Sequence, residues 1–175
     1  MLSGMRATRT PPHIRPAHSS DAERLAEILN QGIEDRVATF ETTPQDPEAL
    51  ARLIAAPPPL IVAELDGSVV GWAKVAAYED RHDYYAGIGE ATLYIAREAR
   101  RQGIGRALLE ALASDAARAG YHKLIGKIFT SNAASIELVH ACGWRDVGVH
   151  QRHGQLDGEW KDVLVVERLL GELAG

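Results

Sequence analysis

The chain has 175 residues, of which 46% are hydrophobic and 25% charged, as expected for an ordinary globular domain with a sizeable core. Its formal net charge of −5 gives no support for a nucleic-acid partner or an anionic membrane partner. The single cysteine, Cys142, excludes an intrachain disulfide and favours a reducing, cytoplasmic location. No apolar run reaches membrane-spanning length and the histidines show no metal-binding spacing, so we expect neither a membrane nor a metal.

The beginning of the chain carries basic residues without an apolar h-region. We therefore expect residues 1–12 to form a disordered lead and not a secretory signal. A single domain is expected over residues 13–170, followed by a short tail at 171–175.

The first half of that domain shows two helical patterns between strand patterns. Ser20 or Asp21 can cap the first helix, and Pro47 suits the first turn of the second. Asp66-Gly67 is typical of a hairpin turn. The elements expected here are a strand at 13–17, helices from about 21 and from 47, and strands at 60–64 and 69–76.

The second half begins with a long loop, 78–89, rich in Asp, His, Tyr and Gly, and loops of this length are often functional. The elements expected after it are strands at 90–95, 123–128, 144–150 and 160–169, with helices ending near 119 and 141. The order β-α-α-β-β-β-α-β-α-β-β predicts a mixed α/β fold with a largely antiparallel central sheet flanked by helices.

A glycine-containing turn joins the strand at 90–95 to the helix that follows. Gly103 and Gly105 lack a Cβ, so the backbone there can adopt unusual dihedral angles and approach a ligand closely. The first N–H groups of the helix have no partner within it and favour an anion. Because Arg100, Arg101 and Arg106 add positive charge, this turn predicts a diphosphate site. The alternative is a turn with a solvated basic face, and the spacing matches neither a dinucleotide fingerprint nor a P-loop.

The order of elements and the R-x-x-G-x-G turn resemble the GNAT superfamily of N-acetyltransferases over residues 13–169. Within it the chain looks most like the phosphinothricin acetyltransferase branch, which acetylates the α-amino group of compounds such as phosphinothricin or methionine sulfoximine. The resemblance to this branch is carried by Ile14-Arg15-Pro16-Ala17, Asn30, Phe40, Pro44, Arg81, Tyr84, Glu90-Ala91-Thr92-Leu93-Tyr94 and Gly158-Glu159-Trp160-Lys161-Asp162-Val163. It implies acetyl-CoA as cosubstrate, a small amine as acceptor, direct attack in a ternary complex, and a homodimer.

The resemblance also implies a cofactor site. In that family the glycine turn binds the pyrophosphate of acetyl-CoA, and an Asn at the position of Asn132 contacts the pantetheine arm. A plain helix cap at Asn132 and a core role for Tyr94 are the alternatives. A backbone amide near Ile95 would polarise the thioester carbonyl. The expected cofactor-binding residues are Leu93, Tyr94, Ile95, Arg100, Arg101, Gln102, Gly103, Ile104, Gly105, Arg106, Asn132 and Ser135.

Glu90 is the expected catalytic base, since the family places a glutamate there and an ammonium group must lose a proton before it attacks a thioester. The alternative is a strand-end glutamate in a surface ion pair. One position departs from the family pattern. The helix after Asn132 usually carries a histidine where this chain has Val139, and His140 is displaced by one residue, which leaves its catalytic role open.

An acidic acceptor would be bound by residues of the long loop, since arginine pairs with carboxylate or phosphinate in a bidentate way. Tyr84 and Tyr85 compete for one role in that loop, and Thr92 shares a strand face with Glu90. The expected substrate-binding residues are Arg36, Phe40, Arg81, Tyr84, Tyr85 and Thr92. Ordinary surface or packing roles are the alternative for each of them.

Three other functions stay open from the sequence. The first is a GNAT transferase for another amine, such as a polyamine or a protein N-terminus. The second is a CoA-binding sensor without catalysis, which the displaced histidine keeps open and Glu90 argues against. The third is a structural domain that binds no ligand.

Overall fold

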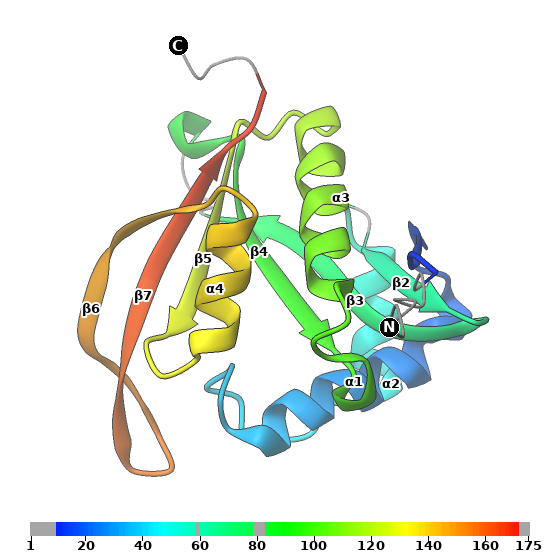
Figure 1. Cartoon of the computed structure of the whole chain (residues 1–175), viewed down its shortest axis with the longest axis horizontal. Coiled ribbons are helices and arrows are strands. Elements are labelled where there is room, and N and C mark those ends of the chain that lie inside the picture. Colours follow the sequence, from blue (N-terminus) through cyan, green and yellow to red (C-terminus); the bar gives the residue numbers. More distant parts are fainter. Residues whose placement is uncertain (1–9, 59, 79–82, 172–175) are drawn as a thin grey trace, which may run out of the picture.

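The computed structural model describes residues 10–58, 60–78 and 83–171 of the chain (Figure 1). Within them the strands are β1 (His13–Pro16), β2 (Ile61–Leu65), β3 (Ser68–Ala77), β4 (Ile88–Ile95), β5 (Lys123–Phe129), β6 (Arg145–Leu156) and β7 (Glu159–Leu169). The α-helices are α1 (Ala22–Asp35), α2 (Pro47–Ala55), α3 (Ile104–Arg118) and α4 (Ala133–Ala141). This order of elements confirms the predicted one. Most of the expected lead and tail, residues 1–9 and 172–175, lies outside the described residues.

The described strands form one sheet in the order β1-β2-β3-β4-β5-β7-β6 (Figure 1). The pair β4–β5 is parallel, and the other neighbouring pairs in this sheet are antiparallel. A parallel pair needs a crossover between its strands, and α3 provides it here. The predicted mixed α/β class with a largely antiparallel sheet is therefore confirmed.

Helices cover both faces of this sheet, as two successive residues of β3 demonstrate. A Cβ on Gly71 would lie 3.1 Å from a methyl carbon of Leu108, so Gly71 faces α3. The indole of Trp72 donates to the carbonyl of Leu25 at 3.3 Å, so Trp72 faces α1. Successive side chains of a strand point to opposite faces. The sheet therefore lies between α1 on one side and α3 on the other, and hydrophobic burial on both sides stabilises it.

Helix caps explain where two of the helices begin. Asp46 accepts the N–H of Ala49 at 2.8 Å ahead of α2, and Asn132 accepts the N–H of Ser135 at 3.1 Å ahead of α4. Asp21, one of the two predicted cap residues, stands at the N-cap position of α1, but its side chain makes no cap bond to that helix. Asp21 accepts the N–H of His18 instead and forms an ion pair with Arg15.

The predicted end of the strand near residue 150 is wrong, since β6 continues to Leu156. A register shift between His150 and Gly154 interrupts its pairing with β7, and Arg152 within it has a φ of 49°. Such a bulge breaks the alternation from which a strand is recognised in a sequence, yet pairing resumes beyond it.

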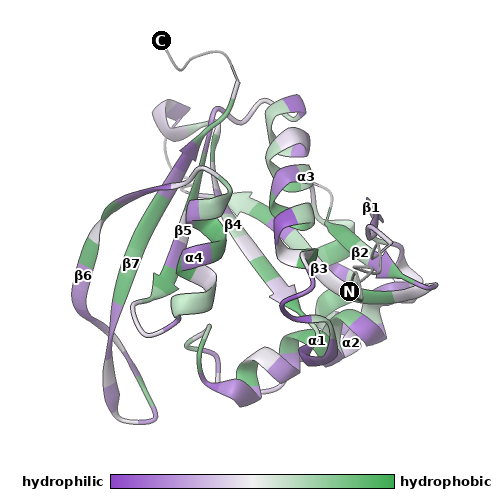
Figure 2. Cartoon of the chain, viewed as in Figure 1, coloured by the Kyte–Doolittle hydropathy of each residue, from purple (hydrophilic) through white to green (hydrophobic). Residues whose placement is uncertain are grey.

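The hydropathy of a strand depends on whether the strand lies inside the sheet or at its edge. Figure 2 shows mainly hydrophobic residues along β3 and mainly hydrophilic ones along β6, the last strand of the sheet. β6 is exposed over most of its length, including Val147 and Val149. In the described part of the chain, no helix combines the length and hydrophobicity that a membrane span requires.

Candidate active site

Two parallel strands separate in the middle of the sheet. β4 and β5 are paired between Ile88–Glu90 and Lys123–Ile125, although both strands continue beyond these residues (Figure 1). After Glu90, the edge of β4 that faces β5 has no ladder partner among the described residues. Backbone polar groups without a partner must meet solvent or a ligand, so this edge is available for binding.

Two adjoining cavities in the described structure occupy this region. The large cavity, of about 630 Å³, is lined by the turn before α3, the start of α3 and the first turns of α4. The small cavity, of about 220 Å³, is lined by the diverging parts of β4 and β5. The two share the lining residues Ala38, Leu93, Tyr94, Asn132, Ser135 and Leu138. We therefore treat them as the two ends of one cleft.

The start of α3 forms one wall of the large cavity. Gly103, its N-cap residue, has a φ of 84°, and no side chain caps the helix there. The first N–H groups of α3 consequently stay available beside the cavity, where the helix dipole favours an anion. A Cβ on Gly105 would lie 2.7 Å from Cδ2 of Leu138, so the absence of a side chain lets α3 approach α4 closely.

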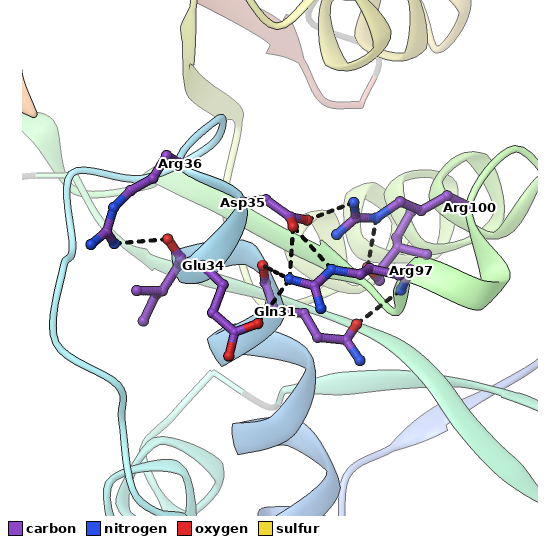
Figure 3. A network of polar contacts seen from close by, with 8 residues as sticks. Gln31, Glu34, Asp35, Arg36, Arg97 and Arg100 are labelled. Carbon is purple, nitrogen blue, oxygen red and sulfur yellow. Dashed lines mark hydrogen bonds and ion pairs between the residues drawn. The ribbon is translucent and has the colours of Figure 1, made fainter.

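Three arginines add positive charge to the same wall. Arg101 and Arg106 are exposed and line the large cavity. Arg100 lines it too, but it forms an ion pair with Asp35 at 2.7 Å (Figure 3). Hydrogen bonding from Arg97, together with Arg100, holds the pKa of Asp35 below its ordinary value. Asp35 therefore stays charged and compensates part of the positive charge of this wall.

The small cavity contains one acidic and one basic side chain. Glu90 Oε2 lies 2.9 Å from Nζ of Lys127, and both residues line the cavity. The ammonium group of Lys127 also lies 5.9 Å from the centre of the Tyr78 ring. Tyr94 lies where the two cavities join, and burial raises its pKa above the ordinary value although a hydrogen bond with Thr39 opposes the shift. Its hydroxyl is therefore neutral at physiological pH.

Comparisons with known proteins agree with this geometry. The Acetyltransferase (GNAT) family model matches residues 24–144. The phosphinothricin N-acetyltransferase of Alcaligenes faecalis is 31% identical, over 95% of this chain and 87% of that protein. The chain belongs to the GNAT family of acetyltransferases.

Two further relatives support this membership. The L-methionine sulfoximine/L-methionine sulfone acetyltransferase of Pseudomonas paraeruginosa is 29% identical, over 88% of this chain and 92% of that protein. The crystal structure of a GNAT superfamily phosphinothricin acetyltransferase from Sinorhizobium meliloti in complex with acetyl-CoA superposes with a TM-score of 0.87. It is 31% identical and covers 93% of this chain and 90% of that one. The predicted GNAT resemblance and the predicted N-acetyltransferase class are confirmed.

In this GNAT acetyltransferase the residues expected to bind the cofactor lie together. All of them except Gln102 line the large cavity. The side chain of Gln102 turns away and donates to the carbonyl of Glu98 at 2.7 Å. Asn132 caps α4 and also donates to the carbonyl of Val37 at 3.2 Å, so its amide joins α4 to the segment after α1. Their roles in binding stay predictions.

The residues expected to bind the acceptor are more scattered. Thr92 lines the small cavity with Glu90. Tyr85 packs edge-on against Tyr78, with ring centres 6.3 Å apart, and Tyr84 packs against Tyr85. Arg81 lies outside the described residues.

Arg36 and Phe40 line neither cavity. Arg36 forms an ion pair with Asp157, 2.9 Å away in the β6–β7 turn. Phe40 packs edge-on against Phe129, which does line the small cavity, and covers Gly154 of β6. Both side chains thus attach the segment after α1 to the β6–β7 hairpin, and acceptor contact by either one stays a prediction.

The displaced histidine lies outside the cleft. His140 Nε2 is 2.6 Å from Asp146 Oδ1 on the surface, whereas Val139 is buried and lines the small cavity. One residue along an α-helix rotates the side chain by about 100°. The displacement by one position therefore turns the imidazole away from the site.

Sequence reasoning missed Lys127 and Asp35. Lys127 had a recognisable signal, because it is a charge in the interior of the otherwise apolar stretch Leu124–Phe129. Asp35 had none, since an acidic residue at a helix end is ordinary in any sequence. The described residues contain no group of three or more His, Cys, Asp or Glu side chains placed to hold a metal ion.

Proposed function

We propose that this chain transfers the acetyl group of acetyl-CoA to the α-amino group of a small amino-acid-like acceptor, such as phosphinothricin or methionine sulfoximine. The observation that carries the proposal is the position of Glu90. Its carboxylate lines the small cavity, which continues into the large cavity beside the uncapped start of α3. The named activities of the relatives from Alcaligenes faecalis and Pseudomonas paraeruginosa support the choice of acceptor.

The residues of the large cavity fit acetyl-CoA. Backbone N–H groups of residues 102–106 and the exposed Arg101 and Arg106 would hold its diphosphate. The edge of β4 beyond Glu90 has no strand partner among the described residues, and the backbone groups of Leu93 with the N–H of Ile95 would bind the amide groups of its pantetheine arm, as an added strand does. The carbonyl of Ile95 already accepts a hydrogen bond from Arg100 at 3.3 Å. When bound, acetyl-CoA supplies an activated acetyl group as a thioester.

The residues of the small cavity would then act on the acceptor. Glu90 takes a proton from the ammonium group by way of a water molecule, which leaves a neutral amine able to attack. A backbone N–H near Ile95 stabilises the negative charge that develops on the thioester oxygen. The acceptor attacks directly, so both substrates are bound together in a ternary complex.

A steady-state assay of CoA release tests this proposal. The acceptor panel contains phosphinothricin, methionine sulfoximine, a polyamine and a peptide with a free N-terminus. We expect turnover with the first two and with neither of the others. Turnover restricted to the polyamine or the peptide would show that the acceptor belongs to that class and is not amino-acid-like. No turnover with any amine would overturn the enzymatic proposal.

The alternative of a CoA-binding sensor needs its own test, because the position of His140 outside the cleft keeps it open. We expect Glu90→Gln to abolish turnover while acetyl-CoA binding, measured by calorimetry, is retained. Glu110→Gln is the matched control, since Glu110 is an exposed acid bonded to Arg168 and lines neither cavity of the cleft. A sensor would show binding without turnover in the unmodified protein.

A cytoplasmic homodimer completes the proposal. The exposed apolar side chains Val147 and Val149 of β6 and Trp160 of β7 support a contact between copies at the hairpin end of the sheet. Light scattering during gel filtration should give twice the mass of the chain. Trp160→Arg should lower this value toward that of a monomer.

A further inference from the structure

The small cavity presents one charge of each sign. Glu90 and Lys127 are the charged members of its lining among the described residues, and the rest of the lining is apolar or neutral. Their side chains are 32% and 42% exposed. Ion pairs with this exposure contribute little to stability. A ligand that offers new partners to Glu90 and Lys127 can therefore replace their ion pair with little loss of stability.

The two charges come from different elements. Glu90 is on β4 at the last paired position before the two strands separate, where it is paired with Ile125 of β5. Lys127 is on β5, two residues beyond Ile125. Lys127 therefore lies where the sheet has opened, next to the ring of Tyr78. Among the ion pairs of the described residues, Glu90 is the acid that Lys127 contacts. A carboxylate entering the small cavity would find a cation that no second acid compensates.

A free α-amino acid matches this arrangement. It carries an ammonium group and a carboxylate on the same carbon atom, so its two charges are close together and opposite in sign to those of Glu90 and Lys127. A polyamine would bring a second cation toward Lys127, and a peptide N-terminus carries a neutral amide in place of the carboxylate. Placing like charges together or leaving a desolvated charge without a partner is unfavourable.

We propose that Lys127 determines the acceptor class by pairing with the free carboxylate of an α-amino acid while Glu90 faces its ammonium group. This inference rests on the acetyl transfer proposed above and adds a specificity-determining residue to it. The chemical step is unchanged. The ammonium group loses one proton to solvent through Glu90 and a second to the departing thiol, as the N–C bond forms and the C–S bond breaks.

The test compares two acceptors that differ in one charge, L-methionine sulfone and its α-carboxamide, with the unmodified protein and with Lys127→Met. We expect the variant to raise KM for the acid about tenfold or more, which is the range for losing a charge-assisted hydrogen bond. The KM for the carboxamide should change less than twofold. Comparing the same acceptor between proteins removes the difference in basicity between the two amines.

Matched variants separate this role from a structural one. Lys161→Met removes a lysine that pairs with Glu159 outside the cleft and should leave both KM values unchanged. Lys127→Arg keeps the charge and should recover most of the preference for the acid. Thermal denaturation and acetyl-CoA binding of Lys127→Met should match those of the unmodified protein.

The outcomes are distinguishable. A KM for the acid that rises less than twofold in Lys127→Met, or an equal rise of both KM values in that variant, would overturn the role of Lys127 while leaving acetyl transfer intact. A third outcome is that Lys127→Met and Lys127→Arg both lose turnover with both acceptors while they still bind acetyl-CoA. That result would assign Lys127 to the positioning of Glu90 and would also overturn the proposal. No turnover by the unmodified protein would instead refute the proposed function itself.

Discussion

Asp35, the last residue of α1, holds Arg100 in the turn before α3, with 2.7 Å between Oδ2 and Nη1. The same carboxylate accepts hydrogen bonds from Arg97, which also reaches Glu34 (Figure 3). The end of α1 leads into the segment beside the cleft, and the turn lines the large cavity. The Asp35–Arg100 pair therefore attaches the end of α1 to the turn that lines the large cavity.

Replacing Asp35 should change how stability depends on pH. The pKa of Asp35 lies below the ordinary 3.8 in the folded chain, mainly because of hydrogen bonding from Arg97. The stabilisation is therefore complete above the ordinary value and is lost as pH falls through the folded pKa. The melting temperature of Asp35→Asn should lie below that of the unmodified protein at pH 7, and the two should converge in acid.

The control for this prediction is Asp115→Asn, which removes an exposed partner of Arg118 within α3. Exposed pairs of this kind contribute little, so its melting profile should follow that of the unmodified protein. A constant offset between Asp35→Asn and the unmodified protein down to pH 3 would contradict the assignment.

Gly105→Ala should destabilise the protein through a contact with α4. The added Cβ would lie 2.7 Å from Leu138 Cδ2 and 3.0 Å from Ile95 Cδ1. Overpacking of this kind costs about 1–3 kcal/mol, and the gain in helix propensity, about 1 kcal/mol, offsets only part of it. Urea denaturation measures the free energy of unfolding. In a Leu138→Ala background the same substitution should become neutral or stabilising.

Gly103→Ala provides the contrast, because a Cβ at Gly103 would meet no atom within 4 Å. Its φ of 84° is instead unfavourable for alanine, at about 1–2 kcal/mol. Leu138→Ala should not relieve this cost. If the Leu138 background affected both glycine substitutions equally, the steric explanation for Gly105 would be wrong.

Arg106→Ala should weaken acetyl-CoA binding selectively. Arg106 lies in the first turn of α3 and lines the large cavity, whereas Arg118 lies in the last turn of the same helix. We expect the Kd for acetyl-CoA, measured by calorimetry, to rise roughly tenfold for Arg106→Ala and to stay unchanged for Arg118→Ala. Added salt should weaken binding to the unmodified protein more than to Arg106→Ala, because screening acts on the charge that the variant lacks.

His140→Ala should leave catalysis intact. The imidazole is bonded to Asp146 on the surface and lines neither cavity of the cleft. We expect kcat and KM within twofold of the unmodified values and an unchanged pH–rate profile, and Asp146→Asn should behave in the same way. A loss of kcat of tenfold or more in His140→Ala alone would return the histidine to the list of catalytic groups.

Much of the fold was predictable because its signals are local. Helical spacing, the helix start at Pro47, the cap at Asn132 and the Asp66-Gly67 turn depend on residues close in sequence, and the structure bears them out. The full length of β6 was not predictable. Its bulge separates two paired segments, and only pairing with β7 shows that they form one strand.

The candidate site, like the fold, was predictable from the sequence only in part. The sequence by itself determined that a strand, a glycine turn and a helix follow one another, with Glu90 near the beginning of that strand. Only the tertiary structure decided which side chains meet there. Lys127 is 37 residues from Glu90, and Asp157 is 121 residues from Arg36. Backbone conformation follows from neighbouring residues, whereas ion pairs across such separations depend on how the sheet and helices pack.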